Sequence, residues 1–370
     1  MGVLVPQNPQ QTTRIAVIPG DGIGPEVTAE AVKVLRAVAA KSGKPLEFQG
    51  FDWGAERYLR DGTTLPAGAP EMLRNDFDAI LFGAVGDPRV PDNRHAHDIL
   101  FGLRFKLDLY VNLRPCVLFD KRLTPLRDRA EADVNFVVVR ENTEGLYAGV
   151  GGQFKPGTAD EVAVQEDVNT RKGVERIIRY AFEYARRRKL KRVCMSDKSN
   201  ALTYGHELWQ RVFKEVRAEY SDIESTHLYI DTLVMELVRD PRQFDVIVTC
   251  NLFGDIVSDL GAQLAGGLGL APSGNINPGG IALFEPVHGS APKIAGKGIA
   301  NPLGAILTAA MLLEYLGSQE ASHPNTWTAE AAAINQAVRA AVTAGHTTPD
   351  LGGKLTTREV ADRVRQSLSG

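Results

Sequence analysis

The feature that most constrains the fold lies near the start of the chain. There, a β-rich run ends in a glycine turn, and a periodic apolar segment follows. Residues 14–19 (RIAVIP) precede the turn at residues 20–24 (GDGIG), and apolar residues then recur at helical spacing from Val27 to Val38. Strand, turn and helix in this order open an α/β unit. The glycines follow G-x-G-x-G and not G-x-G-x-x-G, so the pattern favours a tight structural turn over a Rossmann dinucleotide site.

The remaining chain repeats the alternation of strand and helix. Further apolar runs predict strands covered on both faces, at residues 79–83, 134–140, 192–195 and 244–249. Helical periodicity recurs at residues 173–187, 208–219, 232–239 and, with many small residues that indicate close packing, 303–316. The glycine-rich residues 149–157, followed by residues 161–165, predict a projecting hairpin arm that needs a partner surface.

Composition limits the compartment and the partners. The 370 residues, 44% of them hydrophobic, suffice for one large α/β domain or two joined ones. A net charge of -3 argues against a nucleic-acid binder, and residues 303–316 are too few to span a bilayer. Residues 1–13 form a polar lead-in without the pattern of a secretory signal. Three widely spaced cysteines predict neither disulfides nor a zinc site, so we expect a cytoplasmic protein.

Two carboxylates after an apolar run suggest a metal site. Asp255 and Asp259 are four residues apart, so a helix beginning here carries both on one face, where they repel unless a cation lies between them. Mg²⁺ or Mn²⁺ suits such oxygen ligands. The alternative is that the two carboxylates only complement the helix dipole. Asp231 is a further candidate ligand, which spacing alone does not establish.

Three arginines are candidates for binding an acid. They are Arg104, Arg114 and Arg140, of which Arg140 ends a predicted strand, and arginine binds carboxylates in a bidentate manner. Any one of them can equally form a surface ion pair. Together with an acidic metal site, the three would suit a dicarboxylate that chelates the metal.

Two further residues and one long segment are candidates for the chemistry. Lys198 follows a predicted strand and can act as a base, whereas Tyr147 lies in a glycine-bearing turn and its phenol can act as an acid; packing or solvent contact is the alternative for both. In residues 284–302, glycine and small residues let backbone N–H groups approach a phosphate or nucleotide. From the residues alone the ligand of this segment stays open.

These residues lie in segments that carry a resemblance to a known family. The segments are residues 18–26 (IPGDGIGPE), 111–115 (VNLRP), 140–145 (RENTEG), 197–200 (DKSN), 251–256 (NLFGDI), 285–292 (EPVHGSAP) and 299–302 (IANP). On them, and over residues 14–365 as a whole, the chain resembles the metal-dependent β-decarboxylating dehydrogenases. This family includes isopropylmalate, isocitrate, homoisocitrate and tartrate or D-malate dehydrogenases.

The resemblance implies a fold that the strand pattern alone does not give. It implies an α/β protein with one large twisted mixed sheet shared by two domains. Residues 1–109 and 266–370 would form a cofactor-binding domain, and residues 110–265 a dimerisation and metal/substrate domain. The arm, at about residues 149–166, would clasp its counterpart in a homodimer. Lys198 and Asp231 would enter the active site of the neighbouring subunit.

The resemblance also implies roles for the candidate residues. Tyr147 and Lys198 would be the catalytic acid and base. Asp231, Asp255 and Asp259 would hold Mg²⁺ or Mn²⁺. Residues that would contact the substrate are Arg104, Arg114, Arg140, Leu100, Phe101, Asn200 and Asp231. Residues that would bind the dinucleotide are Glu285, His288, Gly289, Ser290, Ala291, Lys293, Ile294 and Asn301.

The implied substrate follows from the pair before Arg104. Isocitrate enzymes have small polar residues where this chain has Leu100 and Phe101, so an apolar substituent such as isopropyl fits better than a carboxylate. The implied reaction is the NAD-dependent oxidative decarboxylation of 3-isopropylmalate to 4-methyl-2-oxopentanoate, in leucine biosynthesis. Phe101 replaces the usual second leucine, and His97 stands near a glutamate of some members. D-malate or tartrate oxidation is therefore the main alternative, ahead of homoisocitrate or isocitrate oxidation.

Two further alternatives stay open. NAD-using relatives usually have an Asp where this chain has Lys293, so NADP is an alternative to NAD. A non-catalytic acid-binding regulatory subunit is an alternative of another class, although the chain keeps every metal carboxylate, Lys198 and Tyr147.

Overall fold

The computed structural model describes residues 12–319 and 326–369. Most of the predicted N-terminal lead-in lies outside these residues, but Thr13 is buried and begins the first strand, which corrects the predicted end of the lead-in. The chain splits into two compact units. Unit 1 combines residues up to Ala96 with residues from Gly279 onward, and unit 2 is His97–Pro278. The predicted boundaries were 109/110 and 265/266, and the division into two functional domains stays a prediction.

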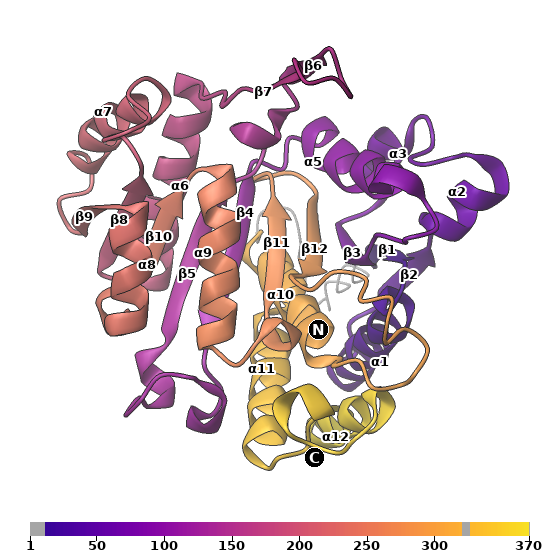
Figure 1. The fold of residues 1–370 in the computed structure, drawn as a ribbon. Coiled ribbons are helices and arrows are strands. Elements are labelled where there is room, and N and C mark those ends of the chain that lie inside the picture. Colours follow the sequence, from indigo (N-terminus) through magenta and orange to yellow (C-terminus); the bar gives the residue numbers. More distant parts are fainter. Residues whose placement is uncertain (1–11, 320–325, 370) are drawn as a thin grey trace, which may run out of the picture. The chain divides into compact units, whose positions relative to one another are not determined.

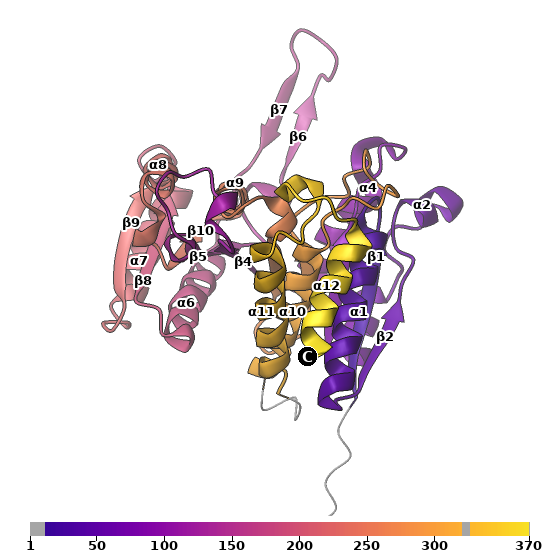
Figure 2. The same cartoon turned by 90° about the horizontal axis from the view of Figure 1, so that it is seen from below.

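Unit 1 has four parallel strands in the order β2-β1-β3-β12. They are β1 (Thr13–Gly20), β2 (Leu46–Gly50), β3 (Ala79–Ala84) and β12 (Ala282–Pro286). The helices of unit 1 are α1 (Gly24–Ser42), α2 (Ala55–Asp61), α3 (Ala69–Asp76), α4 (Arg94–Ala96), α10 (Leu303–Ser318), α11 (Thr328–Thr343) and α12 (Thr357–Ser369). Helices α1, α10, α11 and α12 pack side by side (Figure 2). Nearly every residue of α10 is buried, which explains its apolar and small composition.

The glycine turn between β1 and α1 seats a loop of the same unit. Gly20 and Gly22 have φ of +71° and +59°, which residues with a Cβ rarely adopt. A Cβ on Gly22 would lie 1.9 Å from the backbone oxygen of Ser290, and the N–H of Ile23 donates to that oxygen at 2.8 Å. The turn is therefore structural, as the glycine spacing predicts, and it holds the loop that contains the candidate nucleotide-binding residues.

The main sheet of unit 2 has six strands in the order β11-β4-β5-β10-β8-β9 (Figure 1). They are β4 (Val111–Val117), β5 (Asn135–Glu141), β8 (Arg192–Asp197), β9 (Glu224–Tyr229), β10 (Val246–Thr249) and β11 (Pro272–Ile276). Strand β4 is antiparallel to both neighbours, and the other five strands all run in the opposite direction to β4. The helices are α5 (Gly102–Lys106), α6 (Arg171–Arg188), α7 (Gly205–Arg217), α8 (Ile230–Arg239) and α9 (Asn251–Leu264).

The predicted arm is a separate two-stranded hairpin. Strand β6 (Gly151–Phe154) pairs with β7 (Val162–Gln165) in antiparallel register, and every residue of both strands is exposed. Figure 2 shows the hairpin projecting from the rest of unit 2. Phe154 lies opposite Val162, and Val164 lies two residues further along β7, so these three side chains share one face. The surface that the arm contacts stays a prediction.

The predicted fold class is confirmed. The described residues form a mixed α/β protein, with four parallel strands in unit 1 and six strands of both directions in the main sheet of unit 2. Every strand and helix predicted from apolar periodicity is present, with ends displaced by a few residues. Among the described residues, no helix is both long and apolar enough to cross a membrane.

Candidate active site

The carboxyl ends of four neighbouring strands of unit 2 place most of the candidate residues along one edge. The parallel register aligns Arg140 with Thr249, Thr249 with Ser196, and Asp197 with Tyr229. The segments that follow these strand ends contain the candidate base and the candidate metal ligands. This edge is where open parallel sheets bind their ligands.

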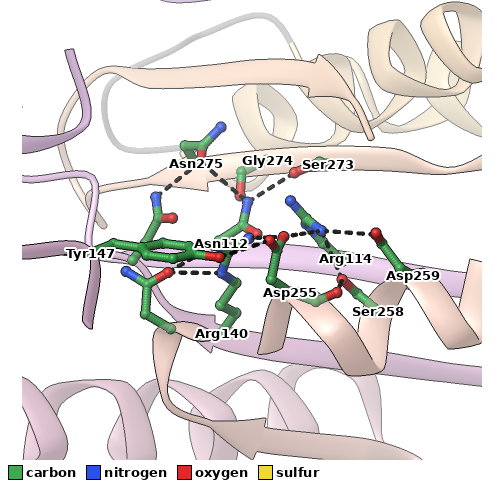
Figure 3. A network of polar contacts seen from close by, with 12 residues as sticks. Asn112, Arg114, Arg140, Tyr147, Asp255, Ser258, Asp259, Ser273, Gly274 and Asn275 are labelled. Atoms are coloured by element: carbon green, nitrogen blue, oxygen red, sulfur yellow. Dashed lines mark hydrogen bonds and ion pairs between the residues drawn. The ribbon is translucent and has the colours of Figure 1, made fainter. Parts of the chain in front are cut away.

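Arg140 is the buried centre of the site. It ends β5, and its side chain is 1% exposed. Its Nε and Nη2 donate to Oδ1 of Asn251 at 3.1 and 2.7 Å, and its Nη1 donates to Oδ1 of Asp255 at 2.5 Å (Figure 3). The glycine at position 254 is required here, because a Cβ on Gly254 would lie 2.4 Å from Cγ of Arg140.

Arg114 lies between the two candidate metal carboxylates. It comes from β4, and its Nη1 contacts Oδ1 of Asp255 at 3.1 Å, Oγ of Ser258 at 2.7 Å and Oδ1 of Asp259 at 3.5 Å. Asp255 and Asp259 therefore lie on one face of α9, as their spacing predicts. In the single chain, the positive charge of Arg114 compensates the negative charges of these two carboxylates.

Burial and the arginines act on the two carboxylates with different results. Burial alone would raise the pKa of Asp255, but the charges of Arg140, Arg114 and Arg104 outweigh it, and the pKa falls below the usual value. Burial raises the pKa of Asp259, and the negative charge of Asp255 adds to this against the attraction of Arg114. Asp259 is thus the carboxylate that a cation would stabilise most.

Tyr147 joins the site through its hydroxyl and its ring. Its phenol donates to Oδ2 of Asp255 at 3.3 Å, and the ring lies under the guanidinium of Arg140 at 5.5 Å. Burial raises the pKa of Tyr147, with a further contribution from Asp255. The phenol therefore keeps its proton at neutral pH, as an acid must.

The predicted substrate-selecting pair lies beside Tyr147. Leu100 and Phe101 lie in a short π-helical turn, His97–Phe101, and both are half-buried. The ring of Phe101 meets that of Tyr147 edge-on at 6.1 Å between centroids. The buried Arg104 stacks its guanidinium on Phe101 at 5.3 Å. The structure thus brings Phe101, Arg104 and Tyr147 together.

Lys198 and Asp231 form a second group at the same edge. The Nζ of Lys198 contacts Oδ1 of Asp231 at 2.6 Å, and this hydrogen bond lowers the pKa of Asp231. The side chain of Asp231 is 61% exposed, and Asn200 is also exposed. Within residues 12–319 and 326–369, no three acidic, histidine or cysteine side chains gather closely enough to hold a metal. A single chain therefore does not bring Asp231 to Asp255 and Asp259.

The candidate dinucleotide-binding residues lie in unit 1, at and after the end of β12. Ser290 is buried against the glycine turn, Ala291 has a φ of +41°, and Lys293 is exposed. Asn301 uses its side chain structurally: Oδ1 accepts from the N–H of Leu303 at 3.0 Å at the start of α10, and Nδ2 donates to Asp350 at 2.9 Å. Of the candidate dinucleotide-binding residues, some are therefore exposed, whereas others are buried or bonded within unit 1.

Three residues of the site escaped the sequence reasoning. Asn251 and Ser258 bind Arg140 and Arg114, and Gly254 makes room for Arg140. All three are on α9, at i, i+3 and i+7 of the segment that begins with Asn251. This helical spacing is the signal that could have found them, because such positions share a face with one another.

The chain is similar to known proteins over nearly its whole length. The family model described as isocitrate/isopropylmalate dehydrogenase matches residues 14–364. A 3-isopropylmalate dehydrogenase of Thermobifida fusca is 48% identical over 97% of this chain and 98% of its own, and one of Corynebacterium kroppenstedtii is 49% identical over 96% and 99%. Among solved structures, an isocitrate dehydrogenase from Methylococcus capsulatus matches with a TM-score of 0.86 and 39% identity, over 97% of this chain and 100% of its own.

Proposed function

Because this chain belongs to the isocitrate/isopropylmalate dehydrogenase family, we propose that it oxidatively decarboxylates 3-isopropylmalate to 4-methyl-2-oxopentanoate, in leucine biosynthesis. The relatives named for this activity, at 48–49% identity, support it over D-malate, tartrate, isocitrate or homoisocitrate oxidation and over a non-catalytic role. The observation that carries the proposal is the cluster of Arg114, Arg140, Asp255 and Asp259, whose charges suit a dicarboxylate together with a cation.

The charges of this cluster explain how an acid and a metal would bind together. In the chain alone, Asp255 accepts from both Arg114 and Arg140. An entering dicarboxylate gives the arginines a new anion, and a divalent cation gives the carboxylates a new positive charge, so neither set is left buried and unpaired. The Nε of Arg114 supports this fit, because it is buried and has no hydrogen-bond partner among the described residues.

The remaining roles follow from donors and acceptors. Asp255 and Asp259, with Asp231 of the partner subunit, would hold Mg²⁺ or Mn²⁺, whose oxygen preference they match. Bound metal supplies a Lewis acid for the developing enolate, and bound NAD supplies the acceptor for hydride. Lys198 takes the proton of the 2-hydroxyl. Tyr147 returns a proton to the carbon that loses CO₂, since its raised pKa keeps the phenol protonated.

A substrate panel tests this function. Purified protein with Mn²⁺ and NAD is expected to turn over 3-isopropylmalate with a kcat/KM at least tenfold above that for D-malate, tartrate or isocitrate. Each buried methylene of the substrate contributes about 0.8 kcal/mol, and Leu100 and Phe101 offer apolar surface for it. A chelator should abolish turnover, and added Mn²⁺ should restore it. An equal or higher kcat/KM for D-malate contradicts the proposed substrate.

NAD is the proposed cofactor, and Lys293 is the residue that tests it. Its side chain is exposed in unit 1, where an ammonium group can meet a 2′-phosphate as well as solvent. Saturation curves for NAD and NADP are expected to favour NAD. Lys293→Asp should widen that preference, because a carboxylate repels the 2′-phosphate and accepts from ribose hydroxyls. An unchanged preference would show that Lys293 does not select the cofactor.

A homodimer is proposed as the active form. Large apolar side chains are exposed on the packed pair α8 and α9, namely Met235, Val238 and Ile256, and on the arm, namely Phe154, Val162 and Val164. An exposed apolar surface of this kind is typical of an interface. We further propose that the protein works in the cytoplasm, which its three buried, unbridged cysteines support.

A further inference from the structure

We infer that His206 is a positioning residue that fixes the backbone of Lys198 for proton transfer. His206 lies in the first turn of α7, eight residues after Lys198, and its side chain is 1% exposed. Its Nδ1 accepts the backbone N–H of Lys198 at 2.8 Å. This role rests on the proposed function of Lys198 as the base.

The contact with Lys198 determines which ring nitrogen carries the proton. A backbone N–H can only donate, so Nδ1 of His206 must be the unprotonated nitrogen. The proton of the neutral ring therefore lies on Nε2, which faces Oδ2 of Asp167 at 3.5 Å. The hydrogen bond with His206 lowers the pKa of Asp167. A carboxylate on the far nitrogen is the usual means by which proteins fix a histidine tautomer and ring orientation.

Asp167 is itself held in place by α7. Its Oδ2 accepts from Nδ2 of Asn169 at 3.0 Å, and Oδ1 of Asn169 accepts from Nε1 of the buried Trp209 at 2.8 Å. The His206 ring also packs against that of Phe253 in a T-shaped arrangement, with centroids 5.4 Å apart. The ring thus has the backbone N–H donor of Lys198 on one side and a fixed carboxylate on the other.

The loop between β8 and α7 explains why this support matters. Lys198 is the first residue after β8, and its carbonyl accepts from the N–H groups of Ala201 and Leu202. Its backbone N–H lies just beyond the last residue of β8, and Nδ1 of His206 accepts the hydrogen bond from it. The side chain of Lys198 is 27% exposed and long, so the position of its Nζ depends on a fixed backbone. A displacement of about 1 Å at a reacting group can cost about a hundredfold in rate.

Two amide variants separate positioning from general support of the fold. His206→Asn places an amide oxygen where Nδ1 stood and keeps an acceptor for Lys198. His206→Gln places its amide where Nε2 stood, so it keeps the contact with Asp167 and loses the one with Lys198. With the acid that the wild type oxidises, H206Q is expected to lose at least tenfold in kcat at a KM within twofold. H206N is expected to stay within about threefold in kcat.

A second measurement needs no substrate and keeps this inference separate from the proposed function. Backbone hydrogen exchange over residues 196–204 is expected to be faster in H206Q than in H206N and the wild type, at unchanged thermal midpoints. Failure of the wild type on 3-isopropylmalate would overturn the proposed substrate and leave the exchange comparison intact. Equal exchange and equal kcat in H206N and H206Q, or no loss in H206Q, would overturn the role of His206.

Discussion

At the scale of single residues, the site depends on a missing side chain as much as on charged ones. Gly254 lies under the aliphatic part of Arg140, and a Cβ there would approach Cβ and Cγ of Arg140 to 2.5 and 2.4 Å. Arg140 is almost fully buried, and burial lowers its pKa to about 9, so it remains charged at neutral pH. Its position therefore depends on Asn251, Asp255 and the absence of a methyl group at position 254.

We predict that Gly254→Ala displaces Arg140 and lowers kcat/KM for the substrate about tenfold to a hundredfold, as expected for a shift of about 1 Å at a binding group. Unfolding stability should fall by about 1–3 kcal/mol, the usual cost of overpacking. Steady-state kinetics and urea unfolding measure the two effects. Gly50→Ala is the matched control, because a Cβ at Gly50 meets no atom within 4 Å. Equal kinetics for both variants would contradict the prediction.

The three cysteines are predicted to be unreactive in the folded protein. Burial raises the pKa of Cys116 and Cys250 to about 12 and that of Cys194 to about 11. Thiolates are the reactive form, so a thiol reagent at pH 8 should modify none of the three until denaturant is added. Rapid modification of the native enzyme would contradict this burial.

The same shifts make stability depend on pH at the alkaline end. Below about pH 8.5 the thiols are neutral in both the folded and the unfolded protein, so their contribution to the free energy of unfolding is fully present. Above that pH the unfolded thiols ionise while the folded ones do not, and the free energy of unfolding falls up to about pH 12. Cys250→Ala should therefore lose less stability than the wild type between pH 8 and pH 10. Equal losses would show that Cys250 does not contribute.

At the scale of elements, apolar runs predicted β1, β3, β5, β8 and β10, and they missed the buried β4 and β12 as well as the polar strands. Strand β3 is buried throughout and was predicted almost to the residue. Strands β2 and β9 are largely exposed and carry no apolar run. In β11 two of the buried side chains are polar: Ser273 and Asn275 both bond to Asn112 of β4 (Figure 3). A pairing between strands far apart in sequence has no local pattern to reveal it.

The site was predictable to a similar extent. The helical spacing of Asp255 and Asp259 was enough to place them on one face, whereas Asp231 and Lys198 were only candidates until the family resemblance implied their roles. His206 could not be found from the sequence, because its contact with Lys198 depends on how a loop returns to the first turn of a helix. Such contacts are set by tertiary structure and not by residue type.

The arm is expected to act through one of its two faces. Phe154, Val162 and Val164 share the apolar face, whereas Ala163 points to the other. Val164→Asp should weaken the proposed dimer at least tenfold, because a charge would be buried there without a partner. The subunit itself should keep its stability within about 0.5 kcal/mol, since Val164 is already 47% exposed in the chain alone. Mass photometry over a dilution series measures the dimer, and Ala163→Asp is the control. Equal dissociation constants would contradict the face assignment.

At the scale of the whole molecule, the proposed sharing of active sites makes an arithmetic prediction. Lys198→Met and Tyr147→Phe should each be inactive alone. If Lys198 serves the partner's Tyr147, a mixed dimer has one intact site and one site that carries both changes. Random exchange makes about half of all dimers mixed, so an equal mixture should recover about a quarter of the wild-type activity. No recovery after verified subunit exchange would place both residues in the same chain's site.

The split of unit 1 between the two ends of the sequence has a consequence for synthesis. Unit 2 is one continuous segment, so it can begin to fold while the ribosome is still translating. Strand β3 is made early, but its neighbour β12 and the helix α10 are made only near the end. Until then, an edge of apolar strand stays open, and such edges are sites of aggregation. A ribosome that stalls late on this message would therefore leave a partly folded product whose open strand edge favours aggregation.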